Sequence, residues 1–438
     1  MSQSTLVPAS HGLWPMHPLR SRILGEVHAR PFRRMAAPRV VLHYAFETPP
    51  AAAGADRAFL DGFCRERGGE GPGPDRKVHM IDVNGGSLRW EQFSEFTSYT
   101  FDCCPPAGSR PFEGRIDDPF GAGFHPPGEL VVATRLDLVS LDSLAGGLAG
   151  AFASFEDIWV SASYVVDRTA LIVTDFRVDR DGRTRILIVD LGLPERQIGA
   201  LVQRLIEIET YRTFAMLGLP EAQAIAPAVN AIERDLVTLA GEIRASSGLE
   251  RNRDMLARLS ALTADLEAAA AASAYRFGAS LAYHEIVGSR LQAIREEPFE
   301  GYSTWAAFLN RRTAPAMRTL ESLQDRQHDL SQRLGRAANL LRTRVDVENE
   351  QQARDVLESM NRRARVQLRL QQTVEGLSVA AVSYYIIGLV GYLAKGDHLL
   401  GLDIDPTVIT ALAVLPVVVL VWLMVRVIRN HHSGEDGG

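Results

Sequence analysis

The pattern of hydrophobic and polar residues divides the chain into two parts. Between residues 38 and 190, apolar and polar residues alternate over short runs that Gly, Pro and Asn-Gly separate, which is typical of β-strands. A helix at 55–67 interrupts this pattern, and a short helix is expected before it, at 17–32. The predicted strands are 39–46, 77–83, 87–93, 95–101, 129–139, 159–166, 170–178 and 184–191. The sequence therefore predicts a mixed α/β domain over residues 1–192.

From residue 193 onward, apolar residues recur every three or four positions, which is the period of a helix. The clearest stripe alternates steps of four and three, as in a coiled coil, and consists of Ile225, Val229, Ile232, Leu236, Leu239 and Ile243. Gly248 predicts a turn, and Pro298 with Gly301 predicts a break before a short helix that reaches Pro315. We expect antiparallel helical hairpins over residues 193–315.

No proline interrupts residues 316–394, so one continuous helix, roughly 120 Å long, is expected there. Its polar part, 316–375, is costly to bury and is expected to form a stalk that is solvated or shared between subunits.

Two apolar runs follow, at 376–394 and 407–425. Neither contains Asp, Glu, Lys or Arg, and each has about the 20 residues that a helix needs to cross a bilayer. Arginines flank the runs at Arg362, Arg363, Arg365, Arg369, Arg426 and Arg429. The positive-inside rule then predicts cytoplasmic termini, including the tail 426–438, and an external loop at 395–406. The whole pattern predicts an α+β protein whose C-terminal transmembrane hairpin lies in the lipid bilayer.

Composition narrows the classes of function that the sequence allows. A net charge of −6 disfavours nucleic acid as a partner. Three cysteines indicate a reducing compartment, and the scarcity of lysine among the cations suggests a bacterial genome, hence the bacterial inner membrane. No Walker, zinc or Ser-His-Asp spacing occurs, so we expect no enzyme, no catalytic residue and no cofactor. Dispersed residues such as His125, Asp175 and Asp190 could form a site only through tertiary proximity.

Two sets of residues are candidates for a functional site in the membrane region. The external loop carries Asp397, Asp403 and Asp405, whose carboxylates could concentrate divalent cations. The first apolar run places mostly small residues on one face: Gly376, Ala380, Ser383, Ile387 and Gly391. Such a face allows close helix packing, between subunits or with the second run, or lines a pore.

The segments HPLRSRILGEVHARPF (17–32) and TVEGLSVAAVSYYIIGLVGYLAK (373–395) resemble the signatures of an uncharacterised family of predicted membrane-anchored bacterial proteins, a domain of unknown function. That resemblance implies membrane anchoring. The order of elements also resembles the CorA-type magnesium channels, which are pentamers gated by cytosolic metal. Those channels carry Gly-Met-Asn at the outer end of the first span, whereas this chain reads Gly-Tyr-Leu-Ala-Lys-Gly from Gly391.

Two functions follow as hypotheses. The first is a membrane-anchored scaffold or regulatory protein, a homo-oligomer through its stalk and transmembrane helices, that recruits an unknown cytosolic partner or senses a ligand. The alternative is a CorA-like channel or transporter for Mg²⁺ or another divalent cation that lacks the Gly-Met-Asn motif.

Overall fold

The computed structural model describes residues 17–20, 23–24, 32–74, 76–83, 85–113, 116, 119–121, 123–155, 159–395 and 405–432. Most of the helix expected at 17–32 lies outside these residues.

A nine-stranded sheet forms the N-terminal part, in the order β2-β3-β4-β1-β5-β8-β7-β6-β9. The strands are β1 (Arg39–Glu47), β2 (Val78–Val83), β3 (Gly86–Gln92), β4 (Phe96–Cys103), β5 (Glu129–Ser140), β6 (Ser161–Val165), β7 (Ala170–Val178), β8 (Thr184–Asp190) and β9 (Glu297–Pro298). The pair β5 and β8 is parallel, and the other pairs are antiparallel. Each of the eight predicted strands is confirmed to within two residues at either end. The strand β9 was not predicted, because two residues carry no periodicity.

Two turns hold the predicted hairpins. Gly85, at φ 71°, joins β2 to β3. Between β7 and β8, Asp179 Oδ1 accepts hydrogen bonds from the backbone N of Asp181 at 2.9 Å and of Arg183 at 3.0 Å. Gly182 supplies the positive φ, 80°, that this turn needs.

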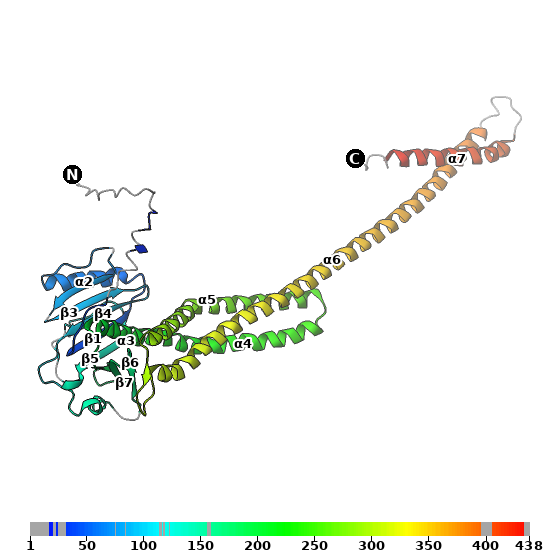
Figure 1. Ribbon diagram of the computed structural model, residues 1–438. Coiled ribbons are helices and arrows are strands. Elements are labelled where there is room, and N and C mark those ends of the chain that lie inside the picture. The colour runs from blue at the N-terminus through cyan, green and yellow to red at the C-terminus, as the bar shows by residue number, and fades with distance from the viewer. Residues whose placement is uncertain are drawn as a thin grey trace, which may run out of the picture. The chain divides into compact units, whose positions relative to one another are not determined.

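Strand alternation gives the sheet two faces, each covered by a different element (Figure 1). On one face, α3 (Glu195–Met216) buries its apolar stripe against residues of β1, β5, β7 and β8, among them Val41, Leu136, Ile172 and Ile188. On the other face, α2 (Ala53–Glu66) covers Leu42, Leu88, Trp90, Tyr99 and Phe101. Burial of each such side chain stabilises the fold by about 1.5–3 kcal/mol.

Four longer helices follow: α4 (Gly218–Ala245), α5 (Leu249–Ala293), α6 (Trp305–Lys395) and α7 (Pro406–His432). Gly248, at φ 105°, forms the predicted turn between α4 and α5. Helix α4 begins at Gly218, directly after Leu217 at the end of α3, and Pro220 lies in its first turn, where a missing N–H costs nothing.

The prediction of a separate short helix before Pro315 was wrong, because α6 runs through this proline as one helix of 91 residues. An internal proline costs a helix about 3 kcal/mol. Apolar side chains on both sides of it are buried in the core, namely Trp305, Leu309, Ala316 and Met317. Their burial, at roughly 1.5–3 kcal/mol each, outweighs that cost.

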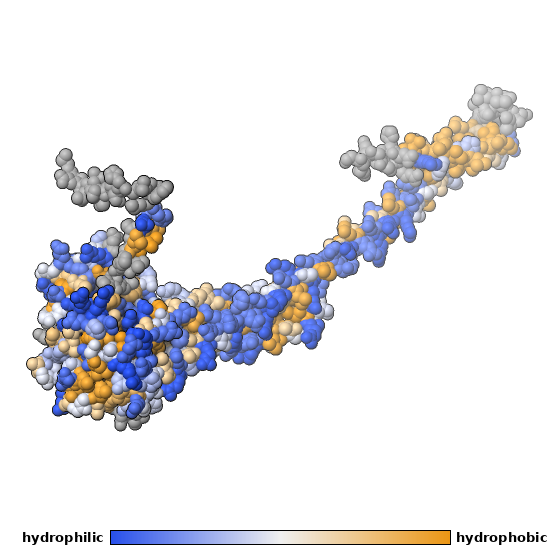
Figure 2. All heavy atoms as spheres, in the orientation of Figure 1, coloured by the Kyte–Doolittle hydropathy of each residue, from blue (hydrophilic) through white to orange (hydrophobic). Residues whose placement is uncertain are grey.

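The chain divides into two compact units, residues 1–239 with 259–336 and residues 240–258 with 337–438. In the second unit, α7 packs beside the end of α6, since Ser383 and Val421 are buried. A Cβ on Gly391 would lie 3.4 Å from Thr410 Oγ1. Both helices include a stretch long and apolar enough to cross a membrane. Figure 2 shows apolar atoms over α7 and the neighbouring end of α6, whereas the middle of α6 is mostly hydrophilic with scattered apolar atoms. The molecule is α+β, as the sequence predicts.

Candidate functional site

A cavity of about 520 Å³ lies in the first unit, between α3 and the strands β1 to β4; we call it the α3 cavity. The sheet contributes His43, Met80, Arg89, Glu91, Phe96, Ser98, Thr100 and Asp102. Helix α3 contributes Gly199, Val202, Gln203, Ile206, Glu207, Thr210 and Tyr211. The rim is completed by Phe32, Arg33, Met35, Phe93 and, from α5, Arg290.

Short polar side chains on β4 create this space. Alternate residues of β4 face α3, and beyond Phe96 these are Ser98, Thr100 and Asp102. Where β5 and β8 face the same helix, Leu136, Leu138, Ile186 and Ile188 fill the interface. The sheet therefore carries a solid core under one part of α3 and a polar hollow under the other.

His43 crosses the cavity as a neutral imidazole. Its Nδ1 lies 2.8 Å from Thr100 Oγ1, and its Nε2 lies 2.9 Å from Thr210 Oγ1. Because the Thr210 hydroxyl donates to Ile206 O at 2.8 Å, Nε2–H must donate to Thr210, and Nδ1 accepts from Thr100. Burial, helped by the nearby Arg89 charge, lowers the pKa of His43 to about 3. The ring links the sheet to α3 and stays uncharged near neutral pH.

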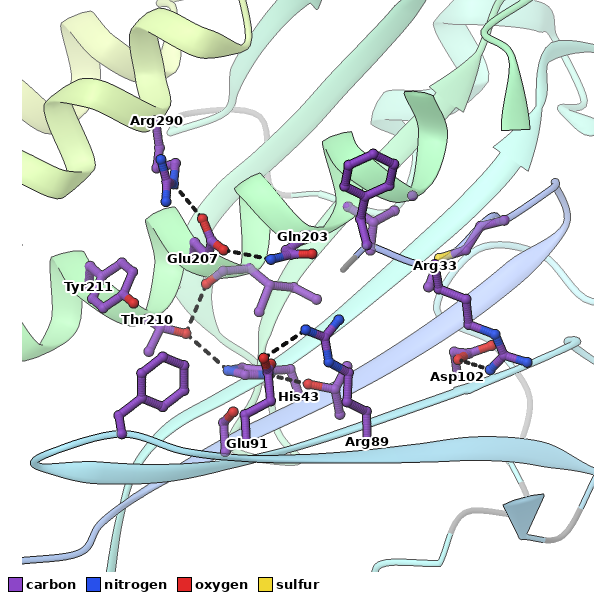
Figure 3. Close-up of a pocket in the computed structure, with 18 of the residues that line it drawn as sticks. Arg33, His43, Arg89, Glu91, Asp102, Gln203, Glu207, Thr210, Tyr211 and Arg290 are labelled. Atoms are coloured by element: carbon purple, nitrogen blue, oxygen red, sulfur yellow. Dashed lines mark hydrogen bonds and ion pairs between the residues drawn. The ribbon is translucent and has the colours of Figure 1, made fainter. Parts of the chain in front are cut away.

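Three arginine–carboxylate pairs surround this ring. Arg89 Nη2 lies 2.7 Å from Glu91 Oε1. Arg290 pairs with Glu207, which also accepts a hydrogen bond of 2.9 Å from Gln203 Nε2. Figure 3 shows Arg89 and Glu91 pointing from the sheet toward the side of α3 that carries Gln203 and Glu207.

The third pair closes the other end of the cavity. Arg33 Nη1 lies 2.9 Å from Asp102 Oδ1, and Arg39 Nη1 lies 3.5 Å from Oδ2. Burial raises the pKa of Asp102, and the two arginines oppose that rise.

Gly199 allows the segment that bears Arg33 to cross α3. A Cβ at Gly199 would lie 1.5 Å from Arg33 O, and Met35 N donates to Glu195 O at 3.2 Å. Residues 33–35, which we call the strap, lie directly against the backbone of α3. The strap positions Arg33 at the rim of the cavity.

Two polar atoms of the lining find no hydrogen-bond partner among the described residues: the donor Arg89 Nε and the acceptor Gln203 Oε1. Buried polar atoms are normally paired, so these two mark polar groups of the lining whose hydrogen-bonding capacity the described residues leave unused. The cavity volume falls within the roughly 300–1,000 Å³ of ligand pockets. Within the described residues, no group of three or more His, Cys, Asp or Glu could hold a metal ion. The arrangement can bind a small polar molecule, whereas its one histidine is committed to two threonines.

The residues singled out from the sequence lie elsewhere. Asp397 and Asp403 lie outside the described residues. Asp405 directly precedes α7, and its Oδ1 accepts from Thr407 N at 3.0 Å and from Thr407 Oγ1 at 2.5 Å. Of the dispersed candidates, Asp175 pairs with Arg185 and Asp190 accepts from the backbone N of residues 192 and 193; neither lines the α3 cavity.

The small-residue face of α6 is only partly covered within the chain. Ser383 is buried and Gly391 lies against Thr410, whereas Ile387 is half-buried and Gly376 and Ala380 are exposed. These contacts favour packing with α7 at the far end of the face.

The sequence alone indicated no residue of the α3 cavity. A faint signal exists in α3, where Thr210 sits on the buried stripe among apolar residues and Gln203 and Glu207 lie one turn apart beside it.

Comparison with known proteins gives one assignment and little else. The sequence model of a family described as "Protein of unknown function (DUF3422)" matches residues 15–432. No curated protein matches the sequence. A solved structure described as "structure of the full-length CmaX protein" aligns at 12% identity with a TM-score of 0.16, over 91% of this chain and all of that chain. A TM-score this low carries no argument about fold or function.

Proposed function

The chain belongs to the family of proteins of unknown function described as DUF3422, and on that premise we propose that it is a membrane-anchored regulatory protein that binds a small molecule in the α3 cavity. The observation that carries this proposal is the cavity itself. Its polar groups are supplied by a rigid sheet and a buried helix, and two of them are unpaired. Such sites are the usual location of ligand binding in a folded domain.

The start of α6 offers a route from the cavity to the rest of the chain. Trp305 and Phe308 of α6 belong to the same core cluster as Leu201 and Leu205 of α3. Glu296 fixes the first turn, since its carboxylate oxygens accept from the backbone N of Trp305 and Ala306 at 2.9 Å each. A ligand that shifts α3 would therefore act on the core in which α6 begins.

Amide hydrogen exchange of the full chain in lipid nanodiscs tests this function. The probe is a mixture of small aromatic carboxylates and their amides at saturating concentration. We expect protection in α3 and altered exchange in the first turns of α6. Ser98→Leu, which fills the cavity and leaves every arginine in place, should abolish both changes. Unchanged exchange in α3 and α6 would reject the proposal.

The anchor is proposed to lie in the bacterial inner membrane. Its support is the pair of apolar helices and the arginines that flank them; by the positive-inside rule these arginines favour an external loop between α6 and α7 and cytoplasmic termini.

Self-association is proposed for the middle of α6. Apolar side chains there are largely exposed within one chain, with exposed fractions of 58% or more at Val356, Leu357, Met360, Val366, Leu368 and Leu370. A second copy would cover them. Light scattering of the detergent-solubilised protein measures this directly, and a monomer would contradict it.

The CorA-like divalent-cation channel is the second candidate. One observation favours it: α6 is one continuous helix from its buried first turns into an apolar stretch. The test is flux of Mg²⁺, Ni²⁺ or Co²⁺ into proteoliposomes, with a triple alanine variant of Asp397, Asp403 and Asp405 as control. Flux no higher than in empty vesicles would dismiss it.

A further inference from the structure

We propose that the α3 cavity selects an organic oxyanion, a small molecule with a carboxylate or phosphate group on an aromatic or aliphatic body. This inference rests on the proposed function, since it names the class of ligand that the same cavity binds.

The first argument is a surplus of donors. Arg33, Arg89 and Arg290 each pair through one guanidinium nitrogen with a carboxylate of the lining. A guanidinium offers five N–H donors and no acceptor. Each guanidinium therefore keeps N–H donors beyond this contact, and a ligand rich in acceptor oxygens can accept from those that face the cavity.

Arg89 is the group best placed to hold the anion. It projects from β3 in the floor of the cavity, its Nε is buried without a partner, and its neighbour His43 is neutral. A charge-assisted pair of hydrogen bonds from one guanidinium to a carboxylate or phosphate fits this geometry. A lysine would offer a point charge without the planar fork.

Apolar side chains line the cavity beside these charges and provide a place for the body of the ligand. Phe93 and Phe96 stack with their ring centroids 4.3 Å apart, and Tyr211 lies edge-on to Phe96 at 6.1 Å. Val202 and Ile206 add aliphatic surface from α3. Phe214 also stacks on Phe96, at 4.5 Å, so these rings offer the ligand apolar surface rather than an open face of Phe96.

Gln203 favours a ligand that also carries a hydrogen-bond donor. Its Oε1 is an unpaired acceptor in the lining. Thr100 Oγ1 also keeps acceptor capacity, because its hydrogen is donated to His43. A hydroxyl or amino group on the ligand would meet these two atoms.

Titration calorimetry of the full chain in nanodiscs, with empty nanodiscs as blank, tests the proposal. The probes are matched pairs that differ in charge at nearly constant shape: 2-naphthoate and 2-naphthamide, indole-3-acetate and indole-3-acetamide, 1-naphthyl phosphate and 1-naphthol. We expect at least one anion to bind ten-fold or more tightly than its neutral partner. The carboxylate and phosphate pairs show which oxyanion is preferred, and either preference supports the proposal.

Three variants test whether Arg89 causes the preference for the anion. Arg89→Gln should reduce the preference for the anion to less than two-fold while the neutral partner binds as before, which also shows that the cavity remains folded. Ser98→Leu should weaken both members of a pair. Arg326→Gln, which removes an arginine that pairs with Glu233 on α4 and does not line the cavity, should change neither.

The outcomes separate this inference from the proposed function. Equal binding of anion and neutral partner, both weakened by Ser98→Leu, would overturn the oxyanion and leave the cavity as a ligand site. An anion preference that survives Arg89→Gln would overturn the role of Arg89 and with it the proposal. No binding of any probe to the wild-type protein would reject both.

Discussion

His43 is the residue that most clearly distinguishes the α3 cavity from an ordinary core. It lies within RVVLHYAF, a run that predicts a buried strand, and nothing in that run indicates what its two ring nitrogens contact. The partners Thr100 and Thr210 are 57 and 167 residues away in sequence. Strand periodicity predicts the burial of such a residue, and only tertiary packing decides its hydrogen bonds.

Thr210→Val should destabilise the protein. The His43 Nε2–H donor would remain buried without an acceptor, which costs about 1–3 kcal/mol. Thr210→Ser keeps the hydroxyl and is the matched control. Thermal unfolding followed by tryptophan fluorescence should show a lower melting temperature for valine than for serine, and equal values would contradict the hydrogen-bond chain described above.

The pH dependence of stability should carry the signature of His43. Its pKa is about 3 when folded and about 6.5 when unfolded, so the unfolded chain takes up a proton first as the pH falls. The stabilisation is complete above pH 6.5 and declines by about 1.4 kcal/mol per pH unit between 6.5 and 3.

His43→Gln removes this group and is the comparison that isolates it. The difference in melting temperature between wild type and His43→Gln should therefore shrink from pH 7 to pH 4. A difference that stays constant over this range would mean that His43 is not buried as a neutral ring.

At the scale of elements, alternation predicted the strands well but did not indicate what covers each face of the sheet. Arg89 and Glu91 on β3, and Ser98, Thr100 and Asp102 on β4, have the pattern of residues that face water. In the structure they face α3 across a cavity. Period two shows that a face is polar, but it cannot show whether water or a helix lies opposite, since that depends on a segment a hundred residues away.

Gly199→Ala should loosen the strap at residues 33–35. The added Cβ would meet Arg33 O at 1.5 Å, so the strap or the helix must move, and the melting temperature should fall by several degrees. Gly278→Ala in α5 is the control, because a Cβ there meets nothing within 4 Å. That control should be neutral or stabilising by about 0.5–1 kcal/mol. A Gly199→Ala protein as stable as Gly278→Ala would show that the strap is not tightly held.

At the scale of the whole molecule, the order of elements was predictable because each pattern extends over many residues. The helical period of α4 to α6 and the two apolar runs were evident from spacing alone, whereas the continuity of α6 through Pro315 was not. The rule that a proline ends a helix considers only neighbouring residues. The buried residues whose packing outweighs the cost of Pro315 belong to the tertiary core.

The proposed orientation of the anchor gives a prediction for the whole chain. Green fluorescent protein fused to the C-terminus should fluoresce, and alkaline phosphatase inserted within 396–404 should be active, because the arginines that flank the apolar runs favour the cytoplasm. With the two reporters exchanged, neither fluorescence nor phosphatase activity should be detected. An active phosphatase at the C-terminus would refute the orientation.

The late position of β9 in the chain determines when the edge of β6 becomes covered during synthesis. Residues 297–298 pair with β6, and Ser303 bridges to Ser161, so this edge of the sheet is covered by a segment that follows α3, α4 and α5 in the chain. An open strand edge is a template for pairing with other chains. While the ribosome is still making those three helices, the edge of β6 stays exposed. During that interval this edge can pair with other chains, and a pause in translation there would prolong its exposure.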